Sequence, residues 1–173
     1  LWKPNGAPGA QIPGQTHLFD EIGHLVEDAR NSLTEGALEA EPRVEAVLWA
    51  DSDMTFPPHA LKRLLDHDLP IVGGLCHNRR PPSYQPTLFR LMPEQFGIED
   101  RYGFCYHYPP DALFKVDATG AGFVLIKREV FEAISRKFPD EKWWDRRGGT
   151  AEDISFMERA RACGFRIYVD TGL

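Results

Sequence analysis

The hydrophobic and polar positions switch repeatedly between helical and strand-like periods along the chain. Apolar residues recur at helical spacing over residues 16–39, which predicts a helix. A continuous apolar run over residues 44–50 predicts a buried strand, and this run stops at the polar residues 51–53. Two prolines begin a second helix, which ends before residue 68, and another buried strand is predicted over residues 71–76.

The same alternation continues to the end of the chain. The remaining predicted elements are strands at 87–91 and 102–108, a strand from residue 114 that enters the turn 119–122, an apolar strand directly after that turn, a helix over 128–138, a helix over 150–163 and a strand over 165–170. Helices and strands that alternate in this way imply right-handed crossovers and a largely parallel sheet. We therefore expect an α/β fold with the strand at 44–50, apolar on both faces, in the centre of the sheet.

Composition narrows the class of protein. The chain has 173 residues, 42% of them apolar, which suits one globular domain with a sizeable core. A net charge of −6 argues against a broad surface for nucleic acid or anionic membrane. No apolar run has the length of a membrane span, and no signal peptide is visible. Because Cys76, Cys105 and Cys163 are separated and form no CxxC motif, we expect reduced thiols in a cytoplasmic protein.

The strongest candidate for chemistry is Asp51-Ser52-Asp53, at the end of the strand predicted over 44–50. In open α/β sheets, ligands bind outside the carboxyl ends of the strands, where these residues would lie. If the chain turns after Asp51, both carboxylates converge on one hard cation, which prefers oxygen ligands. Acidic pairs also end many strands as turn formers and helix caps, so the motif alone leaves both interpretations open.

Three further features have both a functional and a structural interpretation. Arg30 and Asn31 lie within the first helix, either on a solvated polar face or at a ligand. Arg79 belongs to an Arg-Arg pair in a proline-rich loop, where it is either solvated or bound to phosphate, whose oxygens match a guanidinium fork. Gly120 and Gly122 permit positive φ or a close approach of the backbone, as a binding site needs, or they form a tight hairpin turn.

The loop before the last helix carries aromatic residues and leads to an acidic pair. Trp143 and Trp144 offer large faces on which sugars stack, although an indole in such a loop also fills a core. Glu152 and Asp153 follow at the start of the helix. Thr150 with an acidic residue three positions later resembles a capping box, which alone would account for both carboxylates.

Four segments now stand in an informative order along the chain. They are DARN, LWADSDMTFPPHALKRLL, ATGAGFVLIKREVFEAI and GTAEDISFMERARACGFRIYVD. This ordered set resembles the family 2 glycosyltransferases of GT-A fold, particularly their compact bacterial and phage-type members, from about Glu27 onward. The resemblance implies one GT-A-like domain over residues 1–173, related to the Rossmann fold, with a three-layer α/β/α sandwich around a mixed, mainly parallel sheet. We expect the family's first strand to precede Leu1, and a C-terminal segment with a metal-binding histidine to follow Asp170.

The resemblance also implies a site for a nucleotide-sugar. Asp51 and Asp53, with Ser52 between them, match the motif that holds a divalent metal, Mn²⁺ or Mg²⁺, on the diphosphate of the donor. The metal would act as a Lewis acid on the leaving group. Arg30 and Asn31 match positions that border the nucleotide.

The second half of the chain would supply the sugar and acceptor side. Gly120, Ala121 and Gly122 match the backbone that approaches the transferred sugar. Glu152 and Asp153 match the acidic motif that provides the base in inverting members. We assign the base to Asp153, which would take a proton from an acceptor hydroxyl within hydrogen-bond reach.

The expected function is metal-dependent transfer of a sugar from a nucleotide-sugar to a hydroxyl of a sugar, lipid or protein acceptor. Arg79 would contact the donor, and Trp143 and Trp144 would contact the acceptor. The chain would be a cytoplasmic enzyme encoded by a bacterium or a phage. Two alternatives stay open: a catalytically inactive GT-A-like domain that binds a sugar or a protein partner, and a nucleotidyltransferase, for which no Gly-rich activation loop lies near residues 51–53.

Overall fold

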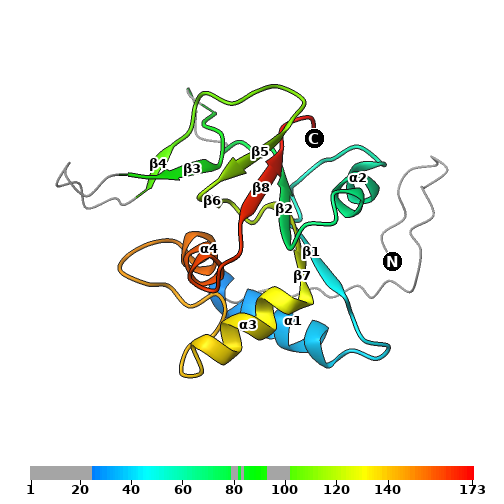
Figure 1. The fold of residues 1–173 in the computed structure, drawn as a ribbon, viewed down its shortest axis with the longest axis vertical. Helices are drawn as coiled ribbons and strands as arrows, with labels where there is room; N and C mark the ends of the chain where they lie inside the picture. The colour runs from blue at the N-terminus through cyan, green and yellow to red at the C-terminus, as the bar shows by residue number, and fades with distance from the viewer. Residues whose placement is uncertain (1–24, 79–81, 83, 93–101) are drawn as a thin grey trace.

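The computed structural model describes residues 25–78, 82, 84–92 and 102–173 (Figure 1). Within them the helices are α1 (Val26–Glu39), α2 (Ala60–Asp66), α3 (Arg128–Lys137) and α4 (Glu152–Ala162). The strands are β1 (Ala46–Ala50), β2 (Ile71–Gly74), β3 (Leu88–Leu91), β4 (Tyr102–Phe104), β5 (Leu113–Val116), β6 (Ala118–Thr119), β7 (Phe123–Lys127) and β8 (Ile167–Asp170). The predicted order of helices and strands is confirmed, apart from residues 16–24 of the first helix, which lie outside the described residues.

The main sheet is mixed, as predicted, but it is not mainly parallel. Its five strands stand in the order β1-β7-β2-β8-β5. β7 runs antiparallel to both of its neighbours, β5 runs antiparallel to β8, and the parallel pair is β2 with β8. The prediction was wrong because β7 returns between β1 and β2, the two strands that the helical crossover was expected to join side by side.

β1 lies at an edge of this sheet in the described part of the chain, so the prediction of a central strand is wrong. β1 pairs with β7 from Ala46 opposite Lys127 to Ala50 opposite Phe123. Trp49 is its buried residue, whereas the first four residues of β7 are all buried. An apolar run does not reveal how many neighbours a strand has, because a distant segment decides the pairing.

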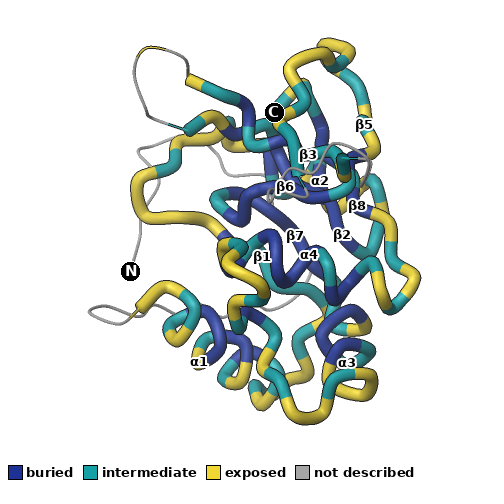
Figure 2. The backbone as a smooth tube through the Cα atoms, turned by 90° about the vertical axis from the view of Figure 1, so that its left-hand side faces the viewer, coloured by how far each residue is buried: buried dark blue, intermediate teal, exposed yellow. Residues whose placement is uncertain are grey.

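Helices pack on both faces of the main sheet. On one face, a large core cluster includes Ile126 of β7, Phe131 of α3 and Phe156 of α4. On the other face, Leu64 of α2 packs in a smaller cluster with Val72 of β2. Figure 2 shows the buried backbone running through β2, β7 and α4.

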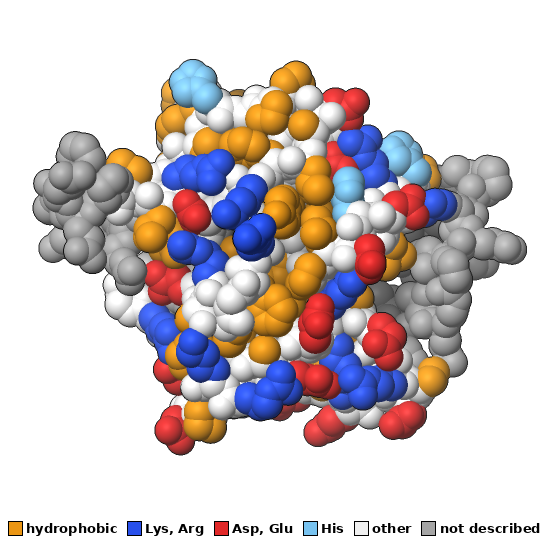
Figure 3. Space-filling view, in the orientation of Figure 1, with side chains coloured by type: hydrophobic (Ala, Val, Ile, Leu, Met, Phe, Trp, Pro, Cys, Tyr) orange, Lys and Arg blue, Asp and Glu red, His pale blue; other side chains and the backbone are white. Residues whose placement is uncertain are grey.

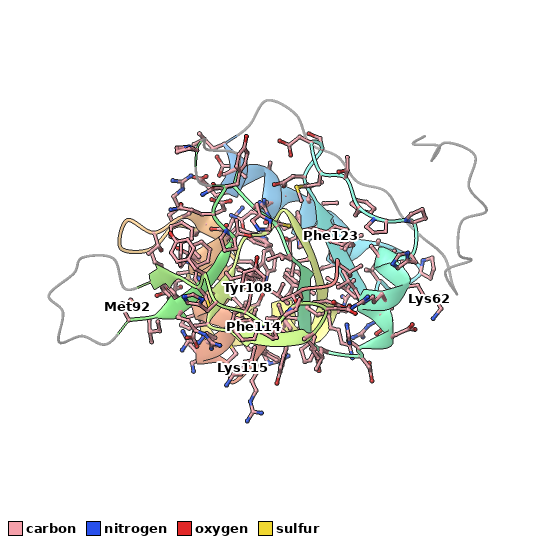
Figure 4. All side chains as sticks on the ribbon, turned by 90° about the horizontal axis from the view of Figure 1, so that it is seen from above. Lys62, Met92, Tyr108, Phe114, Lys115 and Phe123 are labelled. Atoms are coloured by element: carbon pink, nitrogen blue, oxygen red, sulfur yellow. The ribbon has the colours of Figure 1, made fainter. Side chains whose placement is uncertain are left out.

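A second sheet, in the order β4-β3-β6, packs against α4 through β6 (Figure 1). In the main sheet, β1 and β2 both run antiparallel to β7 and therefore point the same way, and β8 is parallel to β2. The carboxyl ends of β1, β2 and β8 consequently meet at one edge, which is uppermost in Figure 1 and faces the viewer in Figure 4. We refer to it as the carboxyl edge, and it is where a ligand is expected in an open α/β sheet.

Two surface features bear on the kind of partner. Among the described residues, no helix has both the length and the apolar character that crossing a membrane requires. On the face drawn in Figure 3, acidic and basic side chains are interspersed, and the described residues form no broad basic surface there.

Candidate active site at the carboxyl edge

The side chain of Arg30 joins three of the predicted site segments. It projects from α1 and is only 7% exposed. Its Nη2 donates a hydrogen bond to Asp51 Oδ1 (3.1 Å), and its Nη1 donates to the carbonyl oxygen of Ala121 (3.3 Å). Its Nε lies 3.7 Å from Glu152 Oε1. Four segments that are far apart in the sequence, and that all belong to the motif set, therefore meet around one guanidinium group.

Two aromatic rings hold this guanidinium in place. The Cζ atom of Arg30 lies 5.6 Å from the ring centroid of Trp49 and 5.1 Å from that of Trp144. The two indoles meet edge to face, with their centroids 4.9 Å apart. Cation–π attraction and packing thus orient the guanidinium of Arg30. The alternative that Arg30 lies on a solvated helix face is wrong, because it is buried and bonded inside the molecule.

Asp51 and Gly122 approach each other closely. The backbone nitrogen of Asp51 donates to the carbonyl oxygen of Gly122 (2.9 Å), and the carbonyl oxygen of Asp51 accepts from Met54 N (3.0 Å), which closes a turn. A Cβ atom on Gly122 would lie 3.3 Å from Asp51 Oδ2. Gly122 therefore serves close approach, since the structure gives it no positive φ.

The TGAG segment is a crossing between the two sheets and not a hairpin turn. β6, which precedes it, pairs with β3, whereas β7, which follows it, pairs with β1 and β2. The backbone nitrogen of Gly120 donates to the carbonyl oxygen of Thr87 (3.2 Å), and a Cβ on Gly120 would lie 3.1 Å from Thr87 Cβ. The hairpin alternative is therefore wrong, and both glycines allow tight contact between backbones.

The acidic residues at the end of β1 carry excess negative charge. Burial raises the pKa of Asp51 above its ordinary value, the Arg30 guanidinium opposes this shift, and the Asp53 carboxylate adds to it. The burial of Asp51 is only partial, since 51% of its side chain is exposed, and Ser52 and Asp53 are also exposed on the turn that follows the strand. Because a nearby cation would relieve this repulsion, the pair is suited to bind one.

Glu152 and Asp153 begin α4, but they do not form a capping box with Thr150. The N-cap residue is Ala151, which makes no side-chain cap, and Asp153 Oδ1 accepts from Ile154 N within the first turn. The hydroxyl of Thr150 instead donates to the carbonyl oxygen of Arg147 (2.7 Å). The capping-box interpretation of the acidic pair is therefore wrong. The position of both carboxylates in the first turn is still favourable, because the N-terminal end of a helix carries partial positive charge.

Asp153 has a pKa that suits a base at neutral pH. Burial raises the pKa of Asp153 to about 6, with a further contribution from the carboxylate of Glu152. The hydrogen bond from Ile154 N (2.7 Å) and the charge of Arg30 act in the opposite direction. Glu152 lies between Arg30 and Arg146, whose Nη2 is 3.8 Å from Glu152 Oε2. We refer to Arg30, Asp51, Glu152 and Asp153 as the Arg30 cluster.

Asn31 lies beside the Arg30 cluster but bonds to a different segment. It is 2% exposed. Its Nδ2 donates to Asp145 Oδ1 (3.0 Å), and its Oδ1 accepts from Trp144 N (3.0 Å). Thr34, one turn further along α1, accepts from Trp144 Nε1 (2.9 Å). The inward face of α1 is thus polar and satisfied, and it holds the loop that leads to α4.

Trp144 is a core residue, so the prediction that it contacts an acceptor is wrong. It is fully buried and stacks on Phe156 at 4.2 Å between ring centroids. Trp143 is partly buried and also turns inward, with its Nε1 donating to the carbonyl oxygen of Phe131 (3.0 Å). The composition of a loop does not tell which way its aromatic side chains point, because they find partners on distant helices.

A second charged cluster, which the sequence did not suggest, holds the same loop. Arg159 of α4 is fully buried, and its Nε and Nη2 donate to Glu141 Oε2 (3.1 and 2.7 Å). Arg147 donates from Nε to the same oxygen (2.6 Å) and from Nη2 to Glu141 Oε1. Hydrogen bonds from Arg147 and then Arg159 outweigh burial and lower the pKa of Glu141 to about 2. We refer to Glu141, Arg147 and Arg159 as the Arg159 cluster.

Asp170 also lies at the carboxyl edge, but its carboxylate forms hydrogen bonds with other groups of the protein. Its buried carboxylate accepts from Arg63 Nε and Nη2 (2.6 and 2.7 Å) and from Gly172 N (3.0 Å), and it lies 2.8 Å from His67 Nε2. Burial raises its pKa, but the hydrogen bonds from Arg63 and His67 hold the pKa of Asp170 below its ordinary value. Asp170 therefore ties β8 to α2.

The described residues do not show two features predicted from the sequence, which are the contact of Arg79 with the donor and a complete metal site. Arg79 lies outside the described residues. In the described part of the chain, no group of three or more His, Cys, Asp or Glu side chains is arranged to hold a metal ion. Within that part, Asp51 and Asp53 thus offer two carboxylates but not a complete set of protein ligands.

Comparison with known proteins supports the fold. No family model and no curated protein matches this sequence. Among solved structures, A197 from STIV is similar, with a TM-score of 0.53 and 16% identity over 85% of this chain. The match spans 64% of the length of that protein. At this identity the likeness shows the fold alone, a mixed α/β architecture.

Proposed function

We propose that this chain is a glycosyltransferase domain of the family 2 type, with a GT-A-like three-layer fold, that transfers a sugar from a nucleotide-sugar to an acceptor hydroxyl. One observation carries the proposal: Arg30 bonds to Asp51 and Ala121 and lies beside Glu152 at the carboxyl edge. These residues belong to the four segments whose order resembles that family. Their convergence at the edge where ligands bind in α/β sheets supports one shared site.

The acidic residues fit a divalent cation that a substrate completes. Asp51 and Asp53 would hold Mn²⁺ or Mg²⁺, with Asp53, which is exposed on the turn after β1, as the direct ligand. Mg²⁺ is commonly bound through one or two carboxylates together with substrate phosphates, so a third protein ligand is not required. When bound, the cation supplies charge neutralisation at the diphosphate.

The donor would lie against Arg30 and the backbone of residues 120–122. Without a side chain at Gly122, the backbone next to Asp51 is open to a close approach by the sugar. Arg30 is held by two rings and two hydrogen bonds, so little further ordering is needed when an anionic donor arrives. Because Arg30 is already engaged by the carboxylates of Asp51 and Glu152, the cation would supply the positive charge that a leaving diphosphate needs.

Asp153 performs the proton transfer. The bond between the anomeric carbon and the diphosphate oxygen breaks, and its electron pair stays on the diphosphate. The acceptor oxygen bonds to that carbon from the opposite face, and the hydroxyl proton passes to the carboxylate of Asp153. A pKa of about 6 leaves Asp153 ionised at neutral pH and still basic enough to assist. Glu152 orients Arg30.

A panel of nucleotide-sugars with Mn²⁺ or Mg²⁺, scored by nucleotide release, tests the proposal. Metal-dependent release from at least one donor is expected, and Asp53→Ala should abolish metal-dependent donor binding while leaving the fold intact. Thermal stabilisation by donors without release would identify the inactive binding domain instead. Pyrophosphate release from a nucleoside triphosphate and a sugar phosphate would identify a nucleotidyltransferase.

A further inference from the structure

Aromatic ring faces are open to solvent beside the small sheet, away from the loop of Trp143 and Trp144. Tyr84, Phe104 and Tyr106 are 58%, 38% and 56% exposed. The ring centroids of Phe104 and Tyr106 lie 6.0 Å apart, so the two rings form a short row. Exposed apolar surface that is concentrated in this way commonly marks a binding site.

Neutral polar groups accompany these rings. Gln85 Nε2 donates to the hydroxyl of Tyr106 (2.8 Å) and links the row to its neighbour in sequence, Tyr84. Asn78 Nδ2 in turn donates to Gln85 Oε1 (3.2 Å), which fixes the amide. We refer to Tyr84, Gln85, Phe104 and Tyr106 as the aromatic patch. It combines ring faces with amide and hydroxyl groups, and none of its residues is acidic or basic.

The aromatic patch is connected to the carboxyl edge by backbone hydrogen bonds. Thr87 N donates to the carbonyl oxygen of Cys76 (2.9 Å), just after β2, and Thr87 O accepts from Gly120 N (3.2 Å). Gly122, which contacts Asp51, is two residues beyond Gly120, and two residues span at most about 7 Å. Gln85 precedes Thr87 by the same number of residues. The patch therefore lies within reach of an extended chain of sugars bound at the Arg30 cluster.

Figure 4 looks onto this edge of the molecule. Tyr108 is drawn between Met92, just after β3, and Phe123, at the start of β7. The hydroxyl of Tyr108 lies 3.5 Å from His77 Nε2, so the segment that carries Tyr106 passes over the segment that follows β2. The segment after β4 thus contacts the segment after β2.

We propose that the aromatic patch binds a neutral oligosaccharide, and that this is the acceptor. Sugar rings present C–H faces, which suit the exposed rings, and hydroxyl groups, which suit Gln85 and the tyrosine hydroxyls. A phosphorylated or acidic ligand would find no opposite charge in the aromatic patch. The role as acceptor rests on the proposed function, whereas the binding of oligosaccharide does not.

The test measures binding of neutral tetrasaccharides of glucose, mannose and N-acetylglucosamine by titration calorimetry, without nucleotide-sugar. The wild-type chain should bind at least one of them. Tyr106→Ala should weaken that binding by about tenfold or more, because a stacked ring is lost. Tyr106→Phe keeps the ring and should retain most of the affinity. Leu65→Ala, which truncates a 37% exposed residue on α2, is the matched control and should bind as the wild type does.

The outcomes separate this inference from the proposed function. Asp153→Asn should bind the tetrasaccharide as tightly as the wild type, because Asp153 is not part of the aromatic patch. If the wild-type chain binds the tetrasaccharide but transfers no sugar to it from any nucleotide-sugar, the patch is retained and the enzyme is rejected. The inference would be overturned if the wild-type chain bound none of the sugars, or if Tyr106→Ala bound them as tightly as the wild type. Light scattering on the same variants gives a second readout. Self-association that Tyr106→Ala abolishes would assign this surface to a second copy of the chain and also overturn the inference.

Discussion

The Arg30 cluster and the Arg159 cluster differ in the balance of charge, although both border the loop between α3 and α4. In the Arg30 cluster, three carboxylates surround one buried guanidinium, with Arg146 reaching Glu152 from outside. In the Arg159 cluster, two guanidinium groups share the single carboxylate of Glu141. Burial, and after it the carboxylate of Glu152, raises the pKa of Asp153 to about 6, whereas hydrogen bonds from Arg147 and Arg159 lower the pKa of Glu141 to about 2.

If the proposed function is correct, this difference distinguishes a ligand site from a cluster that only stabilises the fold. The carboxylate of Glu141 is satisfied by its partners, so the Arg159 cluster stabilises the loop and needs nothing further. The Arg30 cluster retains an excess of negative charge that a cation or a proton would relieve. Perturbed carboxyl groups of this second kind are concentrated at functional sites. We expect the two clusters to respond in opposite ways to substitution and pH.

The largest expected effect is on turnover. Asp153→Asn keeps the shape of the side chain but removes the base, so nucleotide release coupled to transfer should fall by about two to four orders of magnitude. Donor affinity should barely change. Glu152→Gln is the matched control in the same turn of α4. Full activity in Asp153→Asn with loss in Glu152→Gln would move the base to Glu152, and full activity in both would reject the mechanism.

The next effect is on stability, in the Arg159 cluster. Arg159→Met keeps most of the buried volume but leaves Glu141 with Arg147 alone and removes the hydrogen bond to the carbonyl oxygen of Trp143. The free energy of unfolding, measured with urea, should fall by about 2–4 kcal/mol. The exposed Arg166 provides the control, and Arg166→Met should stay within about 0.5 kcal/mol of the wild type. An equal loss of unfolding free energy in both variants would show that the buried Arg159 contributes no more stability than an exposed arginine.

A smaller effect concerns the pH dependence of turnover. Because the pKa of Asp153 is about 6, its basic form disappears below that pH. At saturating substrate, the turnover number should rise about tenfold per pH unit up to pH 6 and level off above it. An inflection near pH 4, the ordinary range of an aspartate, would show that burial does not raise the pKa of the working base.

The smallest expected effect is on the melting temperature, which should change in opposite directions when Asp153 and Glu141 are substituted. The ionised form of Asp153 is disfavoured in the folded state, and this cost is fully present above about pH 6 and absent below the ordinary pKa of 3.8. Asp153→Asn should therefore raise the melting temperature at pH 7. Glu141 has the opposite shift, and its contribution, complete above pH 4.5, is lost as the pH falls toward 2. Glu141→Gln should lower the melting temperature at pH 7, and equal signs would contradict the comparison.

Local pattern was sufficient to predict the helices, the strands and the two acidic motifs at their ends. The apolar runs at β1, β2 and β7 and the helical spacing in α3 predicted those elements to within a few residues. The placement of Asp51 after a strand and of Glu152 and Asp153 at a helix start follows from the same periodicity, because it depends on neighbours in the sequence.

The tertiary structure decided what depends on distant segments. The insertion of β7 between β1 and β2 set the strand order, and it left β1 at an edge among the described residues. Arg30 and Asn31 were buried because their partners, Ala121 and Asp145, come from elsewhere in the chain. The burial of Trp144 has the same origin. Periodicity records which side of its own element a residue lies on, whereas burial and bonding depend on which other element arrives there.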